Sequence, residues 1–142
     1  MRIKQLSVFL ENKSGRLAKI SRVLGEEQIN ILALSLADTA DFGILRMLVD
    51  DPDRAAEVLK EHQFVCIINT VTVVEVDDKP GGLAKVVSVL DDSGINVEYM
   101  YAFSEPETGR AALVFRFNDP DRAAELLAKA GINVIARSRL IP

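Results

Sequence analysis

The most reactive side chains of the sequence are His62 and Cys66, each the only residue of its type in the chain. Their spacing would place two metal ligands on one helix face, but EHQFVC (61–66) is typical of a helix end followed by an apolar strand. A structural zinc site takes four ligands, and a catalytic triad would need this one histidine for every proton transfer. The sequence therefore predicts no metal site, no cofactor and no catalytic activity.

A second candidate for a functional site is a glycine-containing loop that precedes a helix. The loop Asn12–Leu17 (NKSGRL) would present main-chain N–H groups to a carboxylate or phosphate, and it recurs as Asp78–Leu83 (DKPGGL). Asn30 and Asn96 begin the next expected strand of each copy. We expect the parallel course of the first and second strands to bring each asparagine to the same end of the sheet as its loop. A tight turn without a ligand is the alternative.

The loops belong to a duplication of the whole chain. The heptapeptide DPDRAAE occurs at 51–57 and 119–125, and KSGRLAKISRVL (13–24) aligns with KPGGLAKVVSVL (79–90). Internal repeats of this kind indicate repeated structural units. In each heptapeptide an aspartate precedes a proline, which is a helix start signal rather than a functional motif.

Both copies predict the element order βαββαβ. Runs of β-branched and apolar residues indicate strands, and apolar residues at helical spacing indicate two helices per copy. This order predicts an α+β fold of two ferredoxin-like units, antiparallel sheets with helices on one face, with domains at 1–67 and 68–142. The expected strands are 2–10, 29–37, 44–49 and 64–67 in the first copy and 68–77, 95–103, 111–117 and 132–137 in the second.

Composition narrows the class of protein. Of the 142 residues, 49% are hydrophobic, which favours a folded core, and the net charge of −4 disfavours a nucleic-acid partner. No apolar run approaches the roughly 18 residues of a membrane span, so neither a signal peptide nor a membrane segment is expected. A single cysteine suits the reducing cytoplasm, where we expect the protein to act.

The repeated segment resembles the ACT domain, a small module that senses amino acids, and most closely its stand-alone tandem form. The likeness lies in NKSGRLAKISRVLGEEQINI (12–31) and DKPGGLAKVVSVLDDSGINV (78–97) and covers nearly the whole chain. It implies reversible binding of an amino acid in a groove between two ACT units. In the ACT sensor of serine biosynthesis the matching polar residues hold the ligand. They correspond here to Asn12 and Asn30 in the first copy and to Asp78 and Asn96 in the second.

Departures from the pattern distinguish the copies. Gln28 replaces the glycine that usually ends the first helix, and Leu10 and Val76 replace a polar ring residue of that sensor. Asp78 would place a negative charge beside an incoming carboxylate. We therefore expect the first copy to contribute the loop that holds the ligand, and the second to supply a wall or to be a degenerate site.

Other residues are candidates for closing the pocket. Asp38, Thr39 and Asp41 are placed to receive an α-ammonium group, although an ordinary hairpin turn explains them equally well. Phe42, Tyr99 and Tyr101 are candidates for an apolar lining, with strand packing as the alternative. The full set of expected ligand-binding residues is Asn12, Ser14, Gly15, Arg16, Leu17, Asn30, Asp38, Thr39, Phe42, Asp78, Gly81, Asn96, Tyr99 and Tyr101.

The sequence thus predicts a cytoplasmic regulatory protein that binds a free amino acid, forms a homodimer or larger homo-oligomer and modulates an enzyme of amino-acid metabolism. One alternative is a regulatory or structural subunit that binds an enzyme and holds no ligand. An enzyme of ferredoxin-like fold is another. A third is an RNA-binding module, suggested by Tyr99, Tyr101 and Phe103 on one strand, but Glu98 and Glu105 beside them oppose it.

Overall fold

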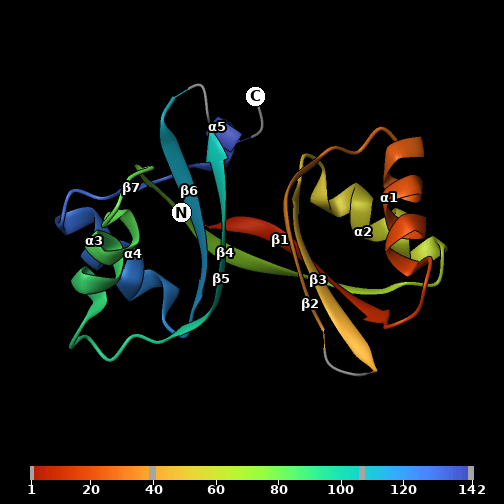
Figure 1. The fold of residues 1–142 in the computed structure, drawn as a ribbon, viewed down its shortest axis with the longest axis horizontal. Helices are drawn as coiled ribbons and strands as arrows, with labels where there is room; N and C mark the ends of the chain where they lie inside the picture. The colour runs from red at the N-terminus through yellow and green to blue at the C-terminus, as the bar shows by residue number, and fades with distance from the viewer. Residues whose placement is uncertain (1, 39–40, 106–107, 141–142) are drawn as a thin grey trace. The chain divides into compact units, whose positions relative to one another are not determined.

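The computed structural model describes residues 2–38, 41–105 and 108–140 (Figure 1). The chain divides into two compact units. The first is Lys4–Asn69, and the second runs from Thr70 onward and includes the residues before Lys4. Each unit has the predicted ferredoxin-like α+β architecture, with helices on one face of an antiparallel sheet, so the predicted fold class is confirmed.

The sheet of the first unit has the strand order β2-β3-β1-β4. β3 pairs antiparallel with both neighbours, with Leu45 opposite Val8 of β1 and Leu36 of β2. The elements are β1 (Ile3–Glu11), α1 (Arg16–Glu26), β2 (Ile31–Asp38), β3 (Phe42–Val49), α2 (Pro52–Glu61) and β4 (Val65–Asp77), which continues into the second unit.

The second unit repeats this order as β7-β4-β6-β5, with every pair antiparallel. β4 is one continuous strand rather than the two expected at 64–67 and 68–77. The last strand, expected at 132–137, is only the two-residue β7, and a short helix follows it. The remaining elements are α3 (Gly82–Leu90), β5 (Val97–Glu105), β6 (Arg110–Phe117), α4 (Pro120–Lys129), β7 (Asn133–Val134) and α5 (Arg137–Leu140).

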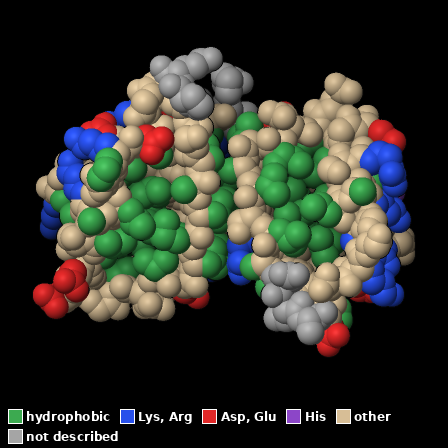
Figure 2. All heavy atoms as spheres, viewed as in Figure 1, with side chains coloured by type: hydrophobic (Ala, Val, Ile, Leu, Met, Phe, Trp, Pro, Cys, Tyr) green, Lys and Arg blue, Asp and Glu red, His purple; other side chains and the backbone are tan. Residues whose placement is uncertain are grey.

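Each unit has its own hydrophobic core between sheet and helices. In the first, Leu6 and Val8 of β1 pack with Ile20 and Leu24 of α1, all fully buried. In the second, Phe115 and Phe117 of β6 stack at 5.0 Å between ring centroids. Figure 2 shows hydrophobic side chains gathered where the sheet and the helices of each unit meet. Burial of these faces is the main force that holds α1 and α3 on their sheets.

The repeated heptapeptide has two structural functions. Asp51 and Asp119 cap α2 and α4 by accepting a hydrogen bond from the N–H groups of Arg54 and Arg122, each at 3.2 Å, which confirms the predicted helix starts. The two arginine side chains then donate to a main-chain carbonyl at the end of the preceding helix, at 2.9 and 2.8 Å. The motif therefore starts one helix and ties it to another.

The turn after α1 has no glycine, as the sequence shows. Gln28 adopts the left-handed conformation itself, with a φ of 59°, close to the 80° of Gly94 in the second unit. A left-handed conformation costs a residue with a Cβ about 1–2 kcal/mol. The fold therefore imposes the same turn on both copies, although only one has the residue suited to it.

Candidate functional site

The two glycine loops have the same main-chain geometry. Gly15 and Gly81 adopt φ values of 86° and 88° immediately before α1 and α3, where a residue with a Cβ would be strained. Asn12 donates its N–H to the carbonyl of Asp41 at 2.9 Å, and Asp78 donates in the same way to Gly109 at 3.1 Å. The predicted loop is thus a fixed turn in each unit.

The structure places Asn12 and Asn30 at opposite ends of the first sheet, so the expectation of a common end is wrong. In the sheet register, Glu11 lies opposite Phe42 at the start of β3, whereas Ile31 lies opposite Val49 at its end. β3 has 8 residues, which separates the two ends by roughly 25 Å at about 3.3 Å per residue. The reason is that α1 carries the chain back along the sheet before β2 begins.

The second unit has the same geometry. Asp78 follows the end of β4 that pairs with Arg110, and Asn96 precedes the end of β5 that pairs with Phe117. Asn96 exchanges hydrogen bonds with Asn118, at 2.8 and 3.2 Å. Asn30 and Asp50 do the same in the first unit. These asparagines therefore join the second strand of a unit to the end of its third.

A small hollow of about 70 Å³ lies beside the first loop and brings three predicted residues together, Asn12, Arg16 and Leu17. We call it the loop hollow. Ser14 and Gly15 belong to the same loop and are exposed. The remaining lining residues are Leu10, Glu11, Lys13, Leu36 and Gly43.

Charges of both signs meet at the loop hollow. Glu11 contacts Lys13 at 2.8 Å and Arg16 at 3.7 Å. The hydrogen bond from Lys13, followed by the charges of Lys13 and Arg16, holds the pKa of the Glu11 carboxyl below its ordinary value. A cationic and an anionic group thus lie side by side at the start of α1.

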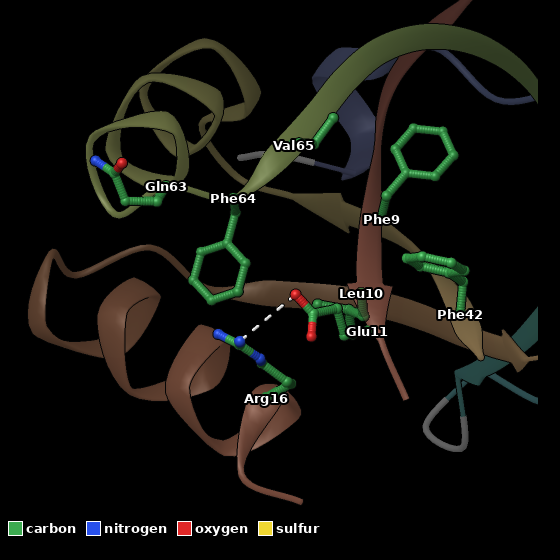
Figure 3. A pocket seen from close by; sticks show the side chains of 8 residues that line it. All are labelled: Phe9, Leu10, Glu11, Arg16, Phe42, Gln63, Phe64 and Val65. Atoms are coloured by element: carbon green, nitrogen blue, oxygen red, sulfur yellow. Dashed lines mark ion pairs between the residues drawn. The ribbon is translucent and has the colours of Figure 1, made fainter. Parts of the chain in front are cut away.

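A second hollow in the first unit is largely apolar, and no contiguous motif predicts it. It measures about 180 Å³, and its apolar wall consists of Phe9, Phe42, Phe64 and Val65 (Figure 3). We call it the aromatic hollow. Phe42, a predicted pocket residue, lies here with 60% of its surface exposed. Leu10, Glu11, Gln63 and Arg16 complete the lining, so Leu10, Glu11 and Arg16 line both hollows.

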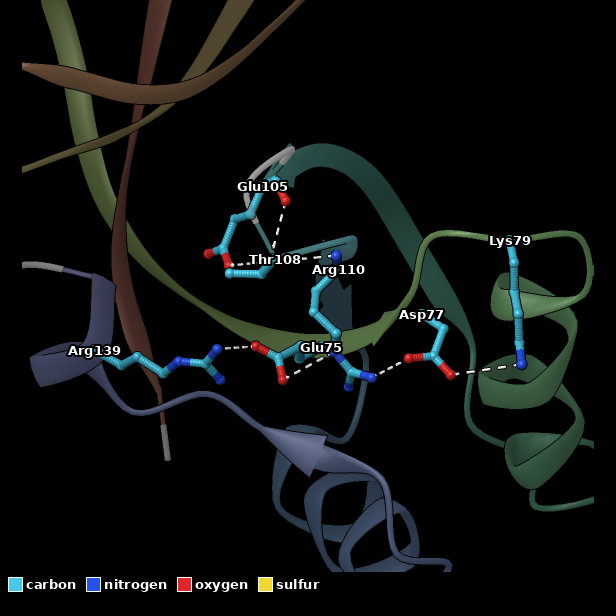
Figure 4. Close-up of polar contacts among 7 residues, drawn as sticks. All are labelled: Glu75, Asp77, Lys79, Glu105, Thr108, Arg110 and Arg139. Carbon is cyan, nitrogen blue, oxygen red and sulfur yellow. Dashed lines mark hydrogen bonds and ion pairs between the residues drawn. The ribbon is translucent and has the colours of Figure 1, made fainter.

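The corresponding place in the second unit is charged. A hollow of about 220 Å³, the charged hollow, includes Glu75, Asp77, Lys79, Gly81 and Arg110. Arg110 pairs with Glu75 at 3.2 Å and also with Asp77, while Lys79 lies 3.6 Å from Asp77 (Figure 4).

Glu75 is the most buried acid of this group, with 10% of its side chain exposed. Arg139 of α5 forms a further ion pair with it. The hydrogen bond from Arg139 is the main reason that the pKa of Glu75 lies below its ordinary value, and burial acts in the opposite direction. The acids of the charged hollow are therefore neutralised by arginines of the same unit.

The other predicted residues are spread over both units. Tyr99 and Tyr101 lie on β5, half-buried, with Tyr101 opposite Val114. Asp38 ends β2, opposite Gly43. Thr39 and the side chain of Asp38 lie outside the described residues.

His62 and Cys66 do not form a common site. The His62 ring lies at the exposed end of α2, where Nδ1–H donates to the Val58 carbonyl at 2.9 Å. Cys66 is buried in the first core, and burial raises the pKa of its thiol. Within residues 2–38, 41–105 and 108–140, no group of histidine, cysteine and carboxylate side chains is arranged to hold a metal ion. Nor is any described helix long and apolar enough to cross a lipid bilayer.

Two ferredoxin-like units with glycine loops of this geometry are the architecture of paired ACT domains. The family model for the ACT domain pair matches residues 1–141, so the chain belongs to that family. The model describes regulatory domains rather than catalytic ones. No curated protein matches the sequence significantly.

Solved structures share this fold. The chain is similar to protein BT0572 from Bacteroides thetaiotaomicron, with 44% identity, a TM-score of 0.92, and coverage of 99% of this chain and 96% of that one. The ligand-free regulatory subunit of aspartate kinase from Thermus thermophilus shares the fold at 18% identity and a TM-score of 0.65, over 89% of this chain and 91% of that one. Aspartate kinase from Synechocystis shares it at 22% identity and a TM-score of 0.58, over 96% of this chain but only 28% of that one.

Proposed function

We propose that this ACT domain pair is a regulatory protein that binds a free amino acid and modulates a partner enzyme of amino-acid metabolism. The loop hollow carries the proposal. There a guanidinium, a carboxylate and an amide, from Arg16, Glu11 and Asn12, lie at the start of α1. An amino acid has both an ammonium and a carboxylate group, so neighbouring charges of opposite sign complement it.

The ligand carboxylate would contact Arg16 and the main-chain N–H groups from Ser14 to Leu17, where the positive end of the α1 dipole adds to the attraction. Asn12 would bind either end of the ligand through its amide. Hydrogen bonds to charged groups contribute about 1.5–3 kcal/mol each. Two or three such contacts are enough for reversible binding of a metabolite.

Asn12 and Asn30 of one unit cannot contact the same ligand, because Asn30 lies at the far end of the sheet from Asn12. In this proposal a second unit, from the same chain or from another, would supply the opposing polar group, which would be Asn30 or Asn96. The wall would come from Phe42, or from Tyr99 and Tyr101, with Asp78 and Gly81 on the second-unit side.

Assembly into a homodimer or larger homo-oligomer supports the same proposal. β2 is the edge strand of its sheet and exposes Leu34 and Leu36 to 51% and 47%, next to Leu17 of α1 at 42%. Exposed apolar groups of this size favour association. Ligand bound between units would stabilise one arrangement of the assembly, and a partner enzyme in the cytoplasm would respond to the change. The regulatory subunit of aspartate kinase, which has this fold, is the precedent for an enzyme partner.

A thermal-shift screen of the twenty amino acids on the purified chain tests the proposal, because a ligand that binds the folded state raises Tm. Calorimetry on Arg16→Ala and Asn12→Ala should then show binding of the responsive amino acid weakened about tenfold or more. Each factor of ten corresponds to about 1.4 kcal/mol. Arg22→Ala, on the exposed side of the same helix, is the matched control and should bind normally.

If no amino acid raises Tm or binds in calorimetry, the chain is a ligand-free subunit, and the proposed sensing function is wrong. If an amino acid binds equally well to Arg16→Ala, Asn12→Ala and the wild type, the proposed sensing function is retained but the proposed location of the binding site is wrong.

A further inference from the structure

The aromatic hollow of the first unit is bordered by apolar side chains that are largely exposed. Phe9, Phe42 and Val65 are 42%, 60% and 65% exposed, and they line one hollow together with the buried Phe64. Figure 3 shows the rings of Phe9 and Phe42 on one side of β1 and the ring of Phe64 on the other side, toward Arg16. Exposed apolar groups that gather at one concave place mark a binding site more often than scattered ones do. At about 180 Å³ the hollow is smaller than the roughly 300–1,000 Å³ of sites for drug-sized molecules. It therefore suits a single side chain.

The polar rim of this hollow is the group that also borders the loop hollow. Arg16 and Glu11 line both, 3.7 Å apart. A ligand whose charged ends contact these two residues would therefore have the aromatic hollow within reach of its side chain.

The second unit provides an internal comparison. Arg110 stands where the first unit has Phe42, since the register pairs Asp77 with Arg110 as it pairs Glu11 with Phe42. Glu75 stands in the same way where the first unit has Phe9. These charges pair with one another within the unit, and the Glu75 side chain is 10% exposed where that of Glu11 is 47% exposed, so the pairs of Glu75 are less open to exchange with a ligand.

The second unit has no arginine at the first position of its helix, and packing keeps one out. Gly82 occupies this position in α3, as Arg16 does in α1. A Cβ at Gly82 would lie 2.7 Å from the main-chain oxygen of Asp77. The two copies therefore differ here, and the first combines an apolar wall with the charged pair of Arg16 and Glu11.

We propose that the aromatic hollow binds the side chain of a large apolar amino acid, aliphatic or aromatic, while Arg16 and Glu11 contact its carboxylate and ammonium groups. This inference rests on the proposed sensing function and specifies its ligand class. The charged hollow takes no such ligand.

The absence of tryptophan from the chain permits a direct test. Phe42→Trp introduces a single fluorophore at the mouth of the hollow, and Val87→Trp places a control on the exposed side of α3, outside the hollow. Each is titrated with phenylalanine, leucine and methionine, and with serine, aspartate and lysine. We expect the apolar ligands to shift the emission of the Phe42→Trp variant to the blue and to leave the Val87→Trp variant unchanged. Calorimetry on Phe42→Ala should show affinity for the apolar ligand reduced about tenfold, with Val87→Ala as the control.

The outcomes separate this inference from the function on which it rests. Binding of a polar amino acid alone, or equal binding by Phe42→Ala and the wild type, overturns the ligand class and leaves sensing intact. Failure of every amino acid to bind the wild type overturns both. Loss of an oligomer in Phe42→Ala with unchanged ligand affinity shows instead that the hollow is a protein contact, which also overturns the inference.

Discussion

Replacement of Glu75 by glutamine should destabilise the fold measurably. The Glu75 carboxylate, on β4, binds two arginines, Arg110 of β6 and Arg139 of α5. It contacts Arg110 at 3.2 Å and forms an ion pair with Arg139, the contact that ties α5 to the sheet. The substitution keeps the size of the side chain, removes its charge and replaces one accepting oxygen with a donating NH2 group. The measured change therefore reports electrostatics rather than packing.

The magnitude follows from the surroundings of each partner. Breaking a fully buried ion pair costs about 3–5 kcal/mol. Here Glu75 is 10% exposed, but Arg139 is 44% exposed and can be hydrated, and Arg110 keeps Asp77 as a partner. The loss should therefore be smaller, about 2 kcal/mol, or roughly 4–8 °C in Tm for a chain of this size.

The effect should also depend on pH. Because the fold lowers the pKa of Glu75, this group stabilises the protein above its unfolded pKa of about 4.3. The contribution is lost as pH falls through the folded pKa. The stability difference between wild type and Glu75→Gln should thus be full at pH 7 and should vanish in acid, where the protonated glutamic acid resembles glutamine.

Urea denaturation at pH 7 and at intervals below pH 5 measures both predictions. Glu125→Gln is the control, since its ion pair with Lys129 is exposed and should contribute no more than about 0.5 kcal/mol. Equal stability of Glu75→Gln and wild type at pH 7, or a difference that persists unchanged into acid, would refute the reasoning.

Three further results are expected. Asp51→Ala and Asp119→Ala should each lower the free energy of unfolding by about 1 kcal/mol in urea titrations, because each removes one helix cap of the same geometry; a clear difference between them would contradict that equivalence. Gly82→Ala should destabilise by more than 1 kcal/mol because its Cβ meets a main-chain oxygen, whereas Gly25→Ala, in open space within α1, should stabilise by up to about 1 kcal/mol; thermal melts reporting the reverse order would contradict the packing argument. Cys66, buried and with a raised pKa, should react with a thiol reagent only after unfolding, so rapid labelling of the native protein would contradict its burial.

Local signals in the sequence predicted the elements well because each acts over a few residues. The Asp-Pro pairs mark where α2 and α4 begin, and the glycines at 15 and 81 mark the turns before α1 and α3. The continuous β4 was harder to foresee, because nothing local distinguishes one long strand from two strands in succession.

The site was less predictable because it depends on the order of strands. The parallel course of β1 and β2 and the same 18-residue spacing in both copies suggested that Asn12 and Asn30 lie close together. A helix between parallel strands, however, returns the chain to the opposite end of the sheet before the second strand begins. The aromatic hollow is assembled from three strands, so no contiguous motif marks it. A usable signal did exist in the alignment of the two copies, where Phe9 and Phe42 correspond to Glu75 and Arg110 amid otherwise similar residues.

The close approach at Gly82 also bears on how the two copies can evolve. An arginine at this position would need the end of β4 to move, because the main-chain oxygen of Asp77 lies where its Cβ would be. The acids and the arginine of the charged hollow would also have to be exchanged for apolar residues. Several substitutions are therefore needed together to make the charged hollow resemble the aromatic hollow, and replacing one member of the cluster alone would leave a partner of Glu75 unpaired.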